Sequence, residues 1–231
     1  MRVGVLLAGG ASSRMGRDKA LVKTRGMSFL AHGVRHLWSA CDSVVVVLGA
    51  RAASIRDAAT QEFETLVAEG RLHQDLLSAH VHGSDGLEVR FAENPGWRSG
   101  MYSSVRVGLQ NALELRPTSV LVMPVDHPAV KPTTVVSLAT AMESALEAYG
   151  GGKPAKGKKR AGTTPFAYAL VPRYRQERGH PVALSPGLSR ALLKDAEAEN
   201  LSDAMRRNAR LVGYLDVADP GVVINKNTPR D

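Results

Sequence analysis

A glycine-rich turn with spaced cations follows the first strand-like run of the sequence. Glycines directly after a buried strand allow a tight turn that points several backbone N–H groups into one concavity, and such a concavity binds anions. Two cations on the same turn would add charge-assisted contacts to phosphoryl oxygens. The residues concerned are Leu7, Ala8, Gly9, Gly10, Ser12, Ser13, Arg14 and Lys19. This combination predicts a site for a phosphate chain, and the alternative is a plain turn with solvated charges.

The turn matches neither of two common phosphate-binding loops. The pattern G-x-x-x-x-G-K followed by Ser or Thr is absent, because Gly16 is followed by Arg17. The dinucleotide-binding pattern G-x-G-x-x-G is absent as well. The sequence therefore predicts a phosphate site of a different class.

A carboxylate, Asp126, follows a second apolar run at residues 119–123. Ligands of open α/β sheets bind at the carboxyl ends of the strands. A carboxylate there suits Mg²⁺ that bridges phosphate oxygens. We therefore interpret Asp126 as a candidate magnesium ligand, and a turn former or helix cap is the alternative.

Short β-branched runs alternate with longer segments of helical period, which is typical of a mostly parallel sheet covered by helices. Strands are expected over residues 3–8, 43–48, 88–92, 119–123, 166–171 and 211–215. Helices are expected over residues 29–41, 55–77, 104–115, 133–149, 188–196 and 202–208. The predicted fold class is α/β, and it places the glycine-rich turn and Asp126 directly after strands.

The composition is that of an ordinary globular protein. The chain has 231 residues, of which 44% are hydrophobic, and a single cysteine. Disorder of the whole chain is excluded, and no apolar run approaches the roughly 18 residues of a membrane helix. We expect a cytoplasmic protein without a membrane partner, in which Cys41 is a buried thiol on the apolar face of a helix.

The net charge of +8 is concentrated in one segment. Residues 150–162 hold five cations and no acid, which leaves +3 for the rest of the chain. The other residues of this segment are Gly, Ala and Pro, so we expect a flexible basic insertion within a single domain of residues 1–231. A contact with nucleic acid is the alternative, but no interleaved aromatic residues support it.

Residues 7–19 carry the pattern L-A-G-G-x-S-x-R-M-G-x-D-K. This pattern resembles the opening motif of the MobA-like NTP transferases, which include the molybdenum-cofactor nucleotidylyltransferases. Residues 93–109 are similar to a segment of the branch that contains the molybdopterin cytidylyltransferases. The strand that ends in Asp126-His127-Pro128, the turn Gly179-His180-Pro181 and the tail from residue 225 also resemble the family. The resemblance therefore covers nearly the whole chain.

This resemblance implies a three-layer α/β/α sandwich with a mostly parallel sheet, the Rossmann-like nucleotidyltransferase (GT-A-like) fold. It also implies a reaction in which a phosphate oxygen of an acceptor attacks the α-phosphorus of an NTP and pyrophosphate leaves. Catalysis then consists mainly of positioning the reactants and neutralising negative charge. By resemblance, Lys19 lies against the α-phosphate, Arg14 and the N–H groups of residues 9–13 hold the β- and γ-phosphates, and Asp126 binds Mg²⁺.

Two asparagines stand where the tail of the family usually carries aspartates. Asn225 and Asn227 are neutral, but an amide carbonyl oxygen can coordinate a hard cation. Either is a candidate second metal ligand, or Asp126 and the phosphates hold the metal alone. His180 is a candidate contact to the acceptor.

The base is expected to be read by the segment from Asn94 to Ser104. This segment follows the third strand, beside the glycine-rich turn, where the base of a nucleotide anchored by its phosphates would lie. Gly100 would let the backbone approach a base edge, while the hydroxyls of Ser103 and Ser104 can donate or accept. The alternative is that one of these serines caps the next helix.

Together these inferences predict a Mg²⁺-dependent nucleotidyltransferase. It would move a nucleoside monophosphate, with CMP favoured, from an NTP to a phosphorylated small molecule such as molybdopterin. A guanylyltransferase or a sugar-phosphate nucleotidylyltransferase of the same fold is the nearest alternative. A nucleotide-binding module without turnover is a further one, which only the asparagines of the tail support.

Overall fold

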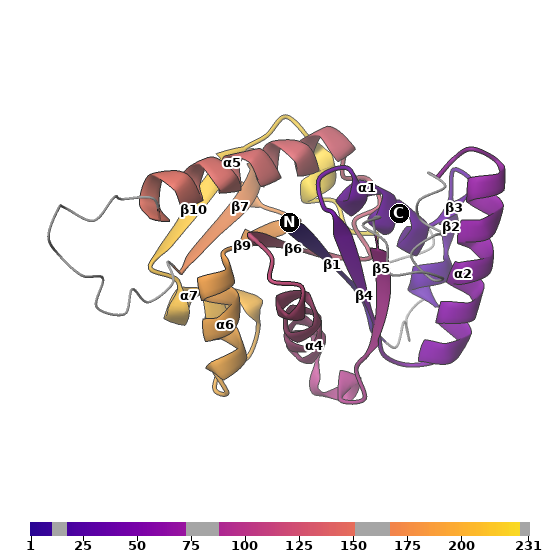
Figure 1. The fold of residues 1–231 in the computed structure, drawn as a ribbon. Helices are drawn as coiled ribbons and strands as arrows, with labels where there is room; N and C mark the ends of the chain where they lie inside the picture. The colour runs from indigo at the N-terminus through magenta and orange to yellow at the C-terminus, as the bar shows by residue number, and fades with distance from the viewer. Residues whose placement is uncertain (11–17, 73–87, 151–166, 227–231) are drawn as a thin grey trace, which may run out of the picture.

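A mostly parallel sheet forms the centre of the molecule (Figure 1). The computed structural model describes residues 1–10, 18–72, 88–150 and 167–226. The strands of the sheet run in the order β10-β7-β9-β6-β1-β4-β5, and β8 pairs with β7. Their bounds are β1 Arg2–Ala8, β4 Ser43–Leu48, β5 Glu88–Glu93, β6 Ser119–Pro124, β7 Tyr168–Tyr174, β8 Glu177–Arg178, β9 Val182–Leu184 and β10 Leu211–Asp216. Among the strands of the described residues, antiparallel pairing in this sheet involves only β8 and β9 and their neighbours.

The central strands are buried on both faces, which explains their continuous apolar sequences. Every residue of β4 is buried, and the strand has the bounds that its valine run predicts. Successive side chains of β1 point to opposite faces, so that Leu6 joins one apolar cluster and Val5 and Leu7 join the other. The sheet therefore supports a core on each side.

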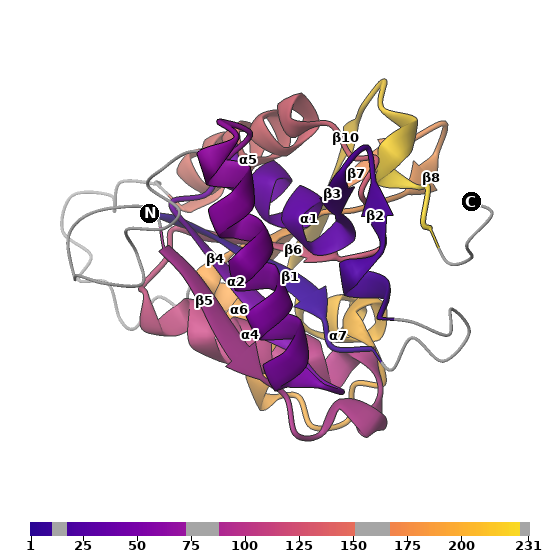
Figure 2. The ribbon, with the colours of Figure 1, turned by 90° about the vertical axis from the view of Figure 1, so that its right-hand side faces the viewer.

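Helices cover both faces of the sheet, which confirms the predicted three-layer arrangement (Figures 1 and 2). One layer contains α1 (Phe29–Trp38), α2 (Ala52–Ala68) and α5 (Pro132–Gly150). The other contains α4 (Met101–Glu114), α6 (Pro186–Lys194) and α7 (Leu201–Asn208). Within the described ranges, no helix is long and apolar enough to cross a membrane.

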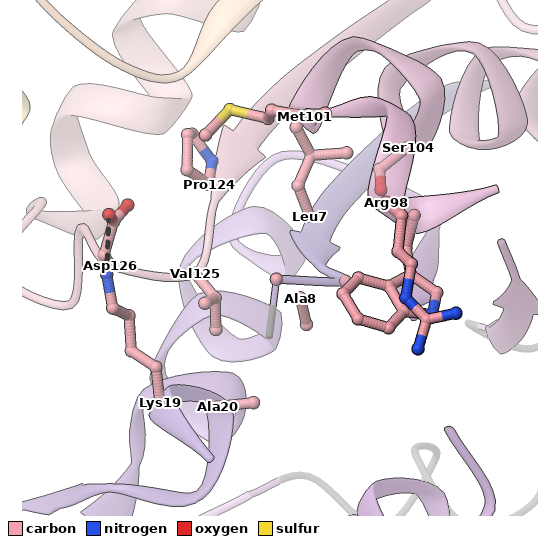
Figure 3. A pocket seen from close by; sticks show the side chains of 14 residues that line it. Leu7, Ala8, Lys19, Ala20, Arg98, Met101, Ser104, Pro124, Val125 and Asp126 are labelled. Atoms are coloured by element: carbon pink, nitrogen blue, oxygen red, sulfur yellow. Dashed lines mark hydrogen bonds and ion pairs between the residues drawn. The ribbon is translucent and has the colours of Figure 1, made fainter. Parts of the chain in front are cut away.

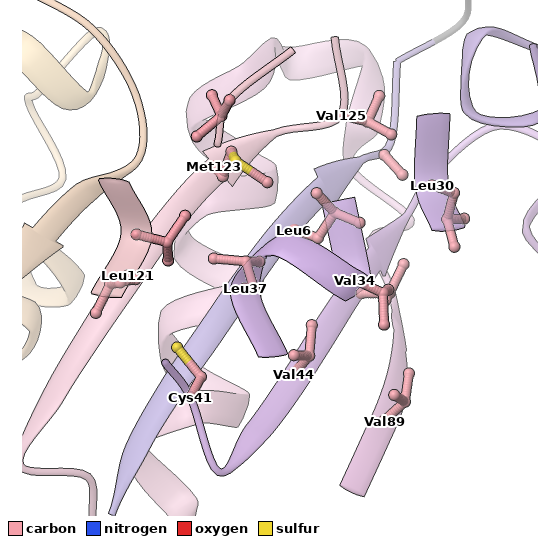
Figure 4. Packing of buried hydrophobic residues seen from close by; sticks show 14 of the residues in the cluster. Leu6, Leu30, Val34, Leu37, Cys41, Val44, Val89, Leu121, Met123 and Val125 are labelled. Carbon is pink, nitrogen blue, oxygen red and sulfur yellow. The ribbon is translucent and has the colours of Figure 1, made fainter. Parts of the chain in front are cut away.

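Two helices approach the sheet closely at glycines. On α1, a Cβ at Gly33 would lie 2.5 Å from Cδ1 of Leu6, a core residue labelled in Figure 4. On α4, a Cβ at Gly108 would lie 2.3 Å from Cγ1 of Val5. These distances are too short for any side chain without a shift of the neighbour, so the two glycines set how tightly both helix layers pack on β1.

Several short elements carry no periodic signal in the sequence. The hairpin of β2 (Lys23–Thr24) and β3 (Met27–Ser28) and the antiparallel strand β9 were not expected. Three 3₁₀ turns lie at η2 (Lys19–Leu21), η3 (Trp97–Ser99) and η4 (Pro220–Val222) in the described chain. Strands of two or three residues are too short for an alternating pattern, and their partners are distant in sequence.

The ends of α1 and α2 differ from the predicted helix ends. The helix that begins at Phe29 ends at Trp38, so the prediction that Cys41 lies on it is wrong, because the chain must turn there to enter β4 at Ser43. Cys41 is nevertheless buried, and burial raises the pKa of its thiol to about 12. Helix α2 ends at Ala68 rather than continuing, and the expected extension beyond residue 72 lies outside the described residues.

Candidate active site

The carboxyl ends of β1 and β6 bring two predicted site residues together. The two strands are parallel neighbours, with Leu7 in register with Pro124. Lys19 lies on the 3₁₀ turn η2 after the glycines, and its Nζ donates to Oδ2 of Asp126 across 3.2 Å (Figure 3). Only 18% of the Lys19 side chain and 15% of the Asp126 side chain are exposed. A sheltered cation and carboxylate thus share the sheet edge where α/β proteins bind ligands.

A cavity of about 490 Å³ opens beside this pair (Figure 3). It is lined by many of the predicted nucleotide-binding and catalytic residues, namely Leu7, Ala8, Gly9, Gly10, Lys19, Gly100, Ser104 and Asp126. Its size is that of a pocket for a small molecule. Ser12, Ser13 and Arg14 lie outside the described residues, so their predicted role remains a prediction.

Other lining residues were not identified as site residues from the sequence. They are Ala20, Trp97, Arg98, Met101, Pro124 and Val125. The Arg98 guanidinium lies 4.8 Å from the centre of the Trp97 ring, and Met101 is 63% exposed at the rim. Trp97 and Met101 belong to the segment that carries the family resemblance, which was the available signal for both.

Asn94 organises the loop before α4 without lining the cavity. Its Nδ2 donates to Oγ of Ser103 at 2.8 Å and to Oγ of Ser104 at 2.9 Å. Its Oδ1 accepts from the backbone N–H of Gly96 at 3.0 Å. Asn94 is 4% exposed, and the structure therefore gives it a positioning role behind Ser104.

The start of α4 does not fit the alternative in which a serine caps this helix. The helix begins at Met101, and Gly100 precedes it with a φ of 100° and without a side-chain cap. Ser103 instead donates to the carbonyl oxygen of Gly100 at 2.7 Å. Ser104 is buried, and a Cβ at Gly9 would lie 2.8 Å from its Oγ. The absence of a side chain at Gly9 therefore permits this contact between the glycine-rich turn and α4.

Two histidines lie beside the carboxylate of Asp126. The rings of His127 and His180 have centroids 4.9 Å apart, and Nε2 of His127 is 3.8 Å from Oδ1 of Asp126. Burial is the main cause that lowers the pKa of His127, and the nearby Lys19 lowers it further, although Asp126 opposes both. Burial, followed by His127, lowers the pKa of His180 to about 4. Both rings are therefore neutral near pH 7.

Asp126 has an oxygen available for a metal ion. Its Oδ1 is buried and has no hydrogen-bond partner among the described residues, whereas Oδ2 accepts from Lys19. No group of three or more His, Cys, Asp or Glu side chains in the described ranges is arranged to hold a metal. A divalent ion at Asp126 would therefore need phosphate, amide or water oxygens as its other ligands.

The C-terminal segment contacts the backbone of Asp126. The N–H of Lys226 donates to the carbonyl oxygen of Asp126 at 2.8 Å. Asn225, one predicted metal ligand, is exposed next to this bond, and Asn227 lies outside the described residues. The tail in which the sequence predicts metal ligands therefore contacts the chain at Asp126, just after β6.

A second cavity, of about 500 Å³, adjoins the first and shares Leu7, Met101 and Pro124 with it. It lies between the sheet and α4 and α7, and its walls are mainly apolar. Its polar residues include His180, Arg178, Asn200 and Arg206. The structure therefore places the candidate acceptor residue His180 in a separate hollow that communicates with the Lys19–Asp126 site.

Several solved structures have a similar fold. A nucleotidyl transferase from Methanothermobacter is 20% identical, with a TM-score of 0.66 over 100% of this chain and 94% of that one. A 4-diphosphocytidyl-2C-methyl-D-erythritol synthase from Anaerococcus prevotii is 12% identical, with a TM-score of 0.63 over 100% and 92%. A molybdopterin-guanine dinucleotide biosynthesis protein A from Archaeoglobus fulgidus is 18% identical, with a TM-score of 0.55 over 100% and 94%. The fold is that of the nucleotidyltransferases.

The family is shown by the sequence itself. The model of the MobA-like NTP transferase domain matches residues 4–211, and the chain belongs to this family. A search of curated protein sequences finds no match to the chain. Family membership confirms the resemblance inferred from the glycine-rich turn and identifies the protein as a nucleotidyltransferase, an enzyme that transfers nucleotidyl groups from NTPs.

Proposed function

We propose that this enzyme transfers CMP from CTP to a phosphorylated small molecule of the molybdopterin kind, with Mg²⁺, and releases pyrophosphate. The observation that carries the proposal is the Lys19–Asp126 pair, which closes one side of a cavity at the glycine-rich turn. A cation and a carboxylate with an unpartnered oxygen are the groups that a reaction on a triphosphate needs.

In this proposal, Lys19 stabilises negative charge at the α-phosphate. An oxygen of the acceptor phosphate forms a bond to the α-phosphorus, and the bond from this phosphorus to the bridging oxygen of pyrophosphate breaks. The N–H groups of Gly9 and Gly10, with Arg14 from the same turn, would bind the leaving pyrophosphate. The Lys19 ammonium is held at Asp126, so its position is fixed before substrate binds.

The proposed metal ligand is Oδ1 of Asp126, with the amide oxygen of Asn225 or Asn227 as a second. The buried Oδ1 would gain the partner that it lacks among the described residues. When bound, Mg²⁺ supplies charge neutralisation of the phosphate oxygens. Asp126 and Lys19 lie in contact, so the carboxylate can also keep the ammonium directed at the phosphates while it holds the ion.

The proposed base contacts come from the start of α4. Ser104 and Gly100 line the cavity, and Asn94 and Ser103 stand behind them as a hydrogen-bonded support. A backbone edge and one fixed hydroxyl suit the polar edge of cytosine. A purine would leave some of these buried polar groups unpaired, which discriminates strongly.

The second cavity is the proposed acceptor pocket. Its apolar walls suit a planar ring system, and Arg178 and Arg206 offer guanidinium groups for a phosphate. His180 lines this hollow, and Nδ1 of its ring has no partner in the described part of the chain. We propose that this ring contacts the acceptor from the wall of the hollow.

Steady-state kinetics with CTP, GTP, ATP and UTP, in the presence of Mg²⁺ and molybdopterin, tests the base assignment. We expect kcat/KM for CTP to exceed that for GTP by on the order of 10²-fold. Ser104→Ala should reduce this ratio, whereas Ser137→Ala, an exposed serine on α5, should not. A clear preference for GTP would instead support guanylyl transfer, which the similarity to the molybdopterin-guanine protein favours as the second candidate.

A further inference from the structure

A third cavity lies beside the β2–β3 hairpin and shares no lining residue with the cavity at the Lys19–Asp126 pair. It has a volume of about 510 Å³ and is bounded by the hairpin, α1 and the segment of residues 128–132. Figure 2 shows β2 and β3 next to α1 on one side of the molecule. The family model, the similar structures and the proposed reaction assign nothing to this hollow.

The walls of this cavity carry an unusual concentration of positive charge. Its cationic lining residues are Arg25, Arg35, Arg71, Lys131 and Lys226. None of the described residues that line it is Asp or Glu. Like charges around one hollow repel one another, and an anion in the hollow would relieve this repulsion.

Arg71 is held in place by the hairpin. Its guanidinium donates to the carbonyl oxygen of Arg25 at 3.0 Å and to that of Gly26 at 3.4 Å. Arg25 has a φ of 48°, and the tight turn of the hairpin exposes these carbonyls to Arg71. Glu69 also contacts Arg71 at 3.2 Å but does not line the cavity. A guanidinium that is already oriented loses less freedom when it binds an oxyanion.

Two histidines of α1 form the inner wall. Nε2 of His32 lies 3.0 Å from the carbonyl oxygen of Thr24, and the ring of His36 is 5.7 Å from that of His32. His36 is only 6% exposed, and its Nδ1 has no hydrogen-bond partner within the described residues. Burial, then His32 and Arg35, lower the pKa of His36 to about 4, so the ring that lines the cavity is neutral near pH 7.

The carboxylate of Asp219 lies near the cavity but does not line it. Asp219 is buried and accepts from the N–H of Lys131 at 2.9 Å and from the hydroxyl of Thr134 at 2.7 Å. These bonds fix the backbone of Lys131, so its position on the rim is defined. The carboxylate is thus already saturated by donors of the fold.

We propose that this hollow is a second anion site, which binds a small molecule through a diphosphate group. Guanidinium and ammonium groups are the donors that phosphate oxygens require. The volume is that of a small-molecule pocket, which favours a free ligand over a nucleic-acid backbone. The ligand is either inorganic pyrophosphate or the diphosphate of a nucleotide, because both present the same chemistry.

Histidine-selective NMR separates this site from the proposed active site. The chain has seven histidines, and the ring signals of His32 and His36 can be assigned with His32→Gln and His36→Gln. Pyrophosphate and CDP are titrated separately into the metal-free protein at physiological ionic strength. Binding at the proposed site shifts the His36 signal, whereas binding beside Asp126 shifts His127 and His180.

We expect a saturable shift of the His36 signal with at least one of the two ligands. Whichever of pyrophosphate and CDP binds more tightly identifies the source of the diphosphate. The double variant Arg35→Ala, Lys131→Ala should weaken this binding roughly tenfold or more, because two charge-assisted contacts are lost. Arg190→Ala, which removes an exposed cation of α6, should leave it unchanged.

An unshifted His36 signal with both ligands would overturn the proposal, even if His127 and His180 respond. Equal affinities in the double variant and in the wild type would also overturn it. The proposed nucleotidyl transfer is unaffected by either result, because it depends on Lys19 and Asp126.

Discussion

Replacement of Asn94 by alanine tests how the loop before α4, the proposed base-reading loop, is held in place. The side chain makes three hydrogen bonds, to Ser103, Ser104 and the N–H of Gly96. The three partners are affected unequally when the Asn94 side chain is removed. Ser103 keeps its bonds to the carbonyls of Gly96 and Gly100, and Gly96 is exposed to water. Ser104 is 4% exposed and keeps no other hydrogen bond among the described residues.

The decrease in the free energy of unfolding in Asn94→Ala should therefore come mainly from the Ser104 hydroxyl, which loses its partner. A buried polar group left without a partner costs about 1–3 kcal/mol, a large part of the 5–15 kcal/mol that stabilises a typical domain. The KM for the NTP should rise as well, because Ser104 lines the cavity and lies against Gly9.

Urea unfolding followed by tryptophan fluorescence measures the loss of stability, and initial rates give the KM. Ser103→Ala is the matched control, since Ser103 is less buried and Asn94 would keep its bond to Ser104. We expect that control to cost less than about 0.5 kcal/mol. Equal free energies of unfolding in the two variants would show that Asn94 does not support the loop through Ser104. So would NTP binding by Asn94→Ala that equals binding by the wild type.

Three further changes address other parts of the molecule. Arg14→Ala should raise the Kd for NTP with little change in the unfolding midpoint, because a phosphate contact is lost; calorimetry that finds an unchanged Kd would exclude this role. Gly108→Ala should destabilise the protein by about 1–3 kcal/mol through overpacking against Val5, while Gln110→Ala on the exposed face of α4 should not; equal urea midpoints would contradict the close approach. Deletion of residues 151–161 should leave cooperative thermal unfolding intact, because a shorter connection between α5 and β7 changes the closure entropy only slightly; a non-cooperative transition would show that the segment belongs to the core.

The main elements of the fold could be predicted because their sequences repeat with the period of the structure. The valine run of residues 43–48 gave β4 with its observed bounds, and β1, β5 and β6 differ from expectation by a residue at one end. The strand expected at residues 166–171 instead begins at Tyr168 and ends at Tyr174. Short β9 could not be predicted, since its position between β6 and β7 depends on pairings with residues that are distant in sequence.

The structure brings together two candidate site residues that the sequence predicted separately. Lys19 and Asp126 were identified separately, and their contact follows from the parallel pairing of β1 with β6. Asn94 was expected at the base, but its donors are used to hold two serines. The apolar hollow around Arg178 and the cationic hollow around His36 were not anticipated, because each is assembled from segments that no local pattern connects.

The most direct test of the account is pyrophosphate release by the wild type and by Lys19→Ala, measured with CTP, Mg²⁺ and molybdopterin. Lys23→Ala is the matched control, because this neighbouring lysine is exposed on the hairpin. We predict that pyrophosphate release depends on the acceptor, that its rate falls on the order of 10²-fold or more in Lys19→Ala, and that the control changes little. Full turnover by a folded Lys19→Ala variant would contradict the central claim that the Lys19–Asp126 site performs nucleotidyl transfer.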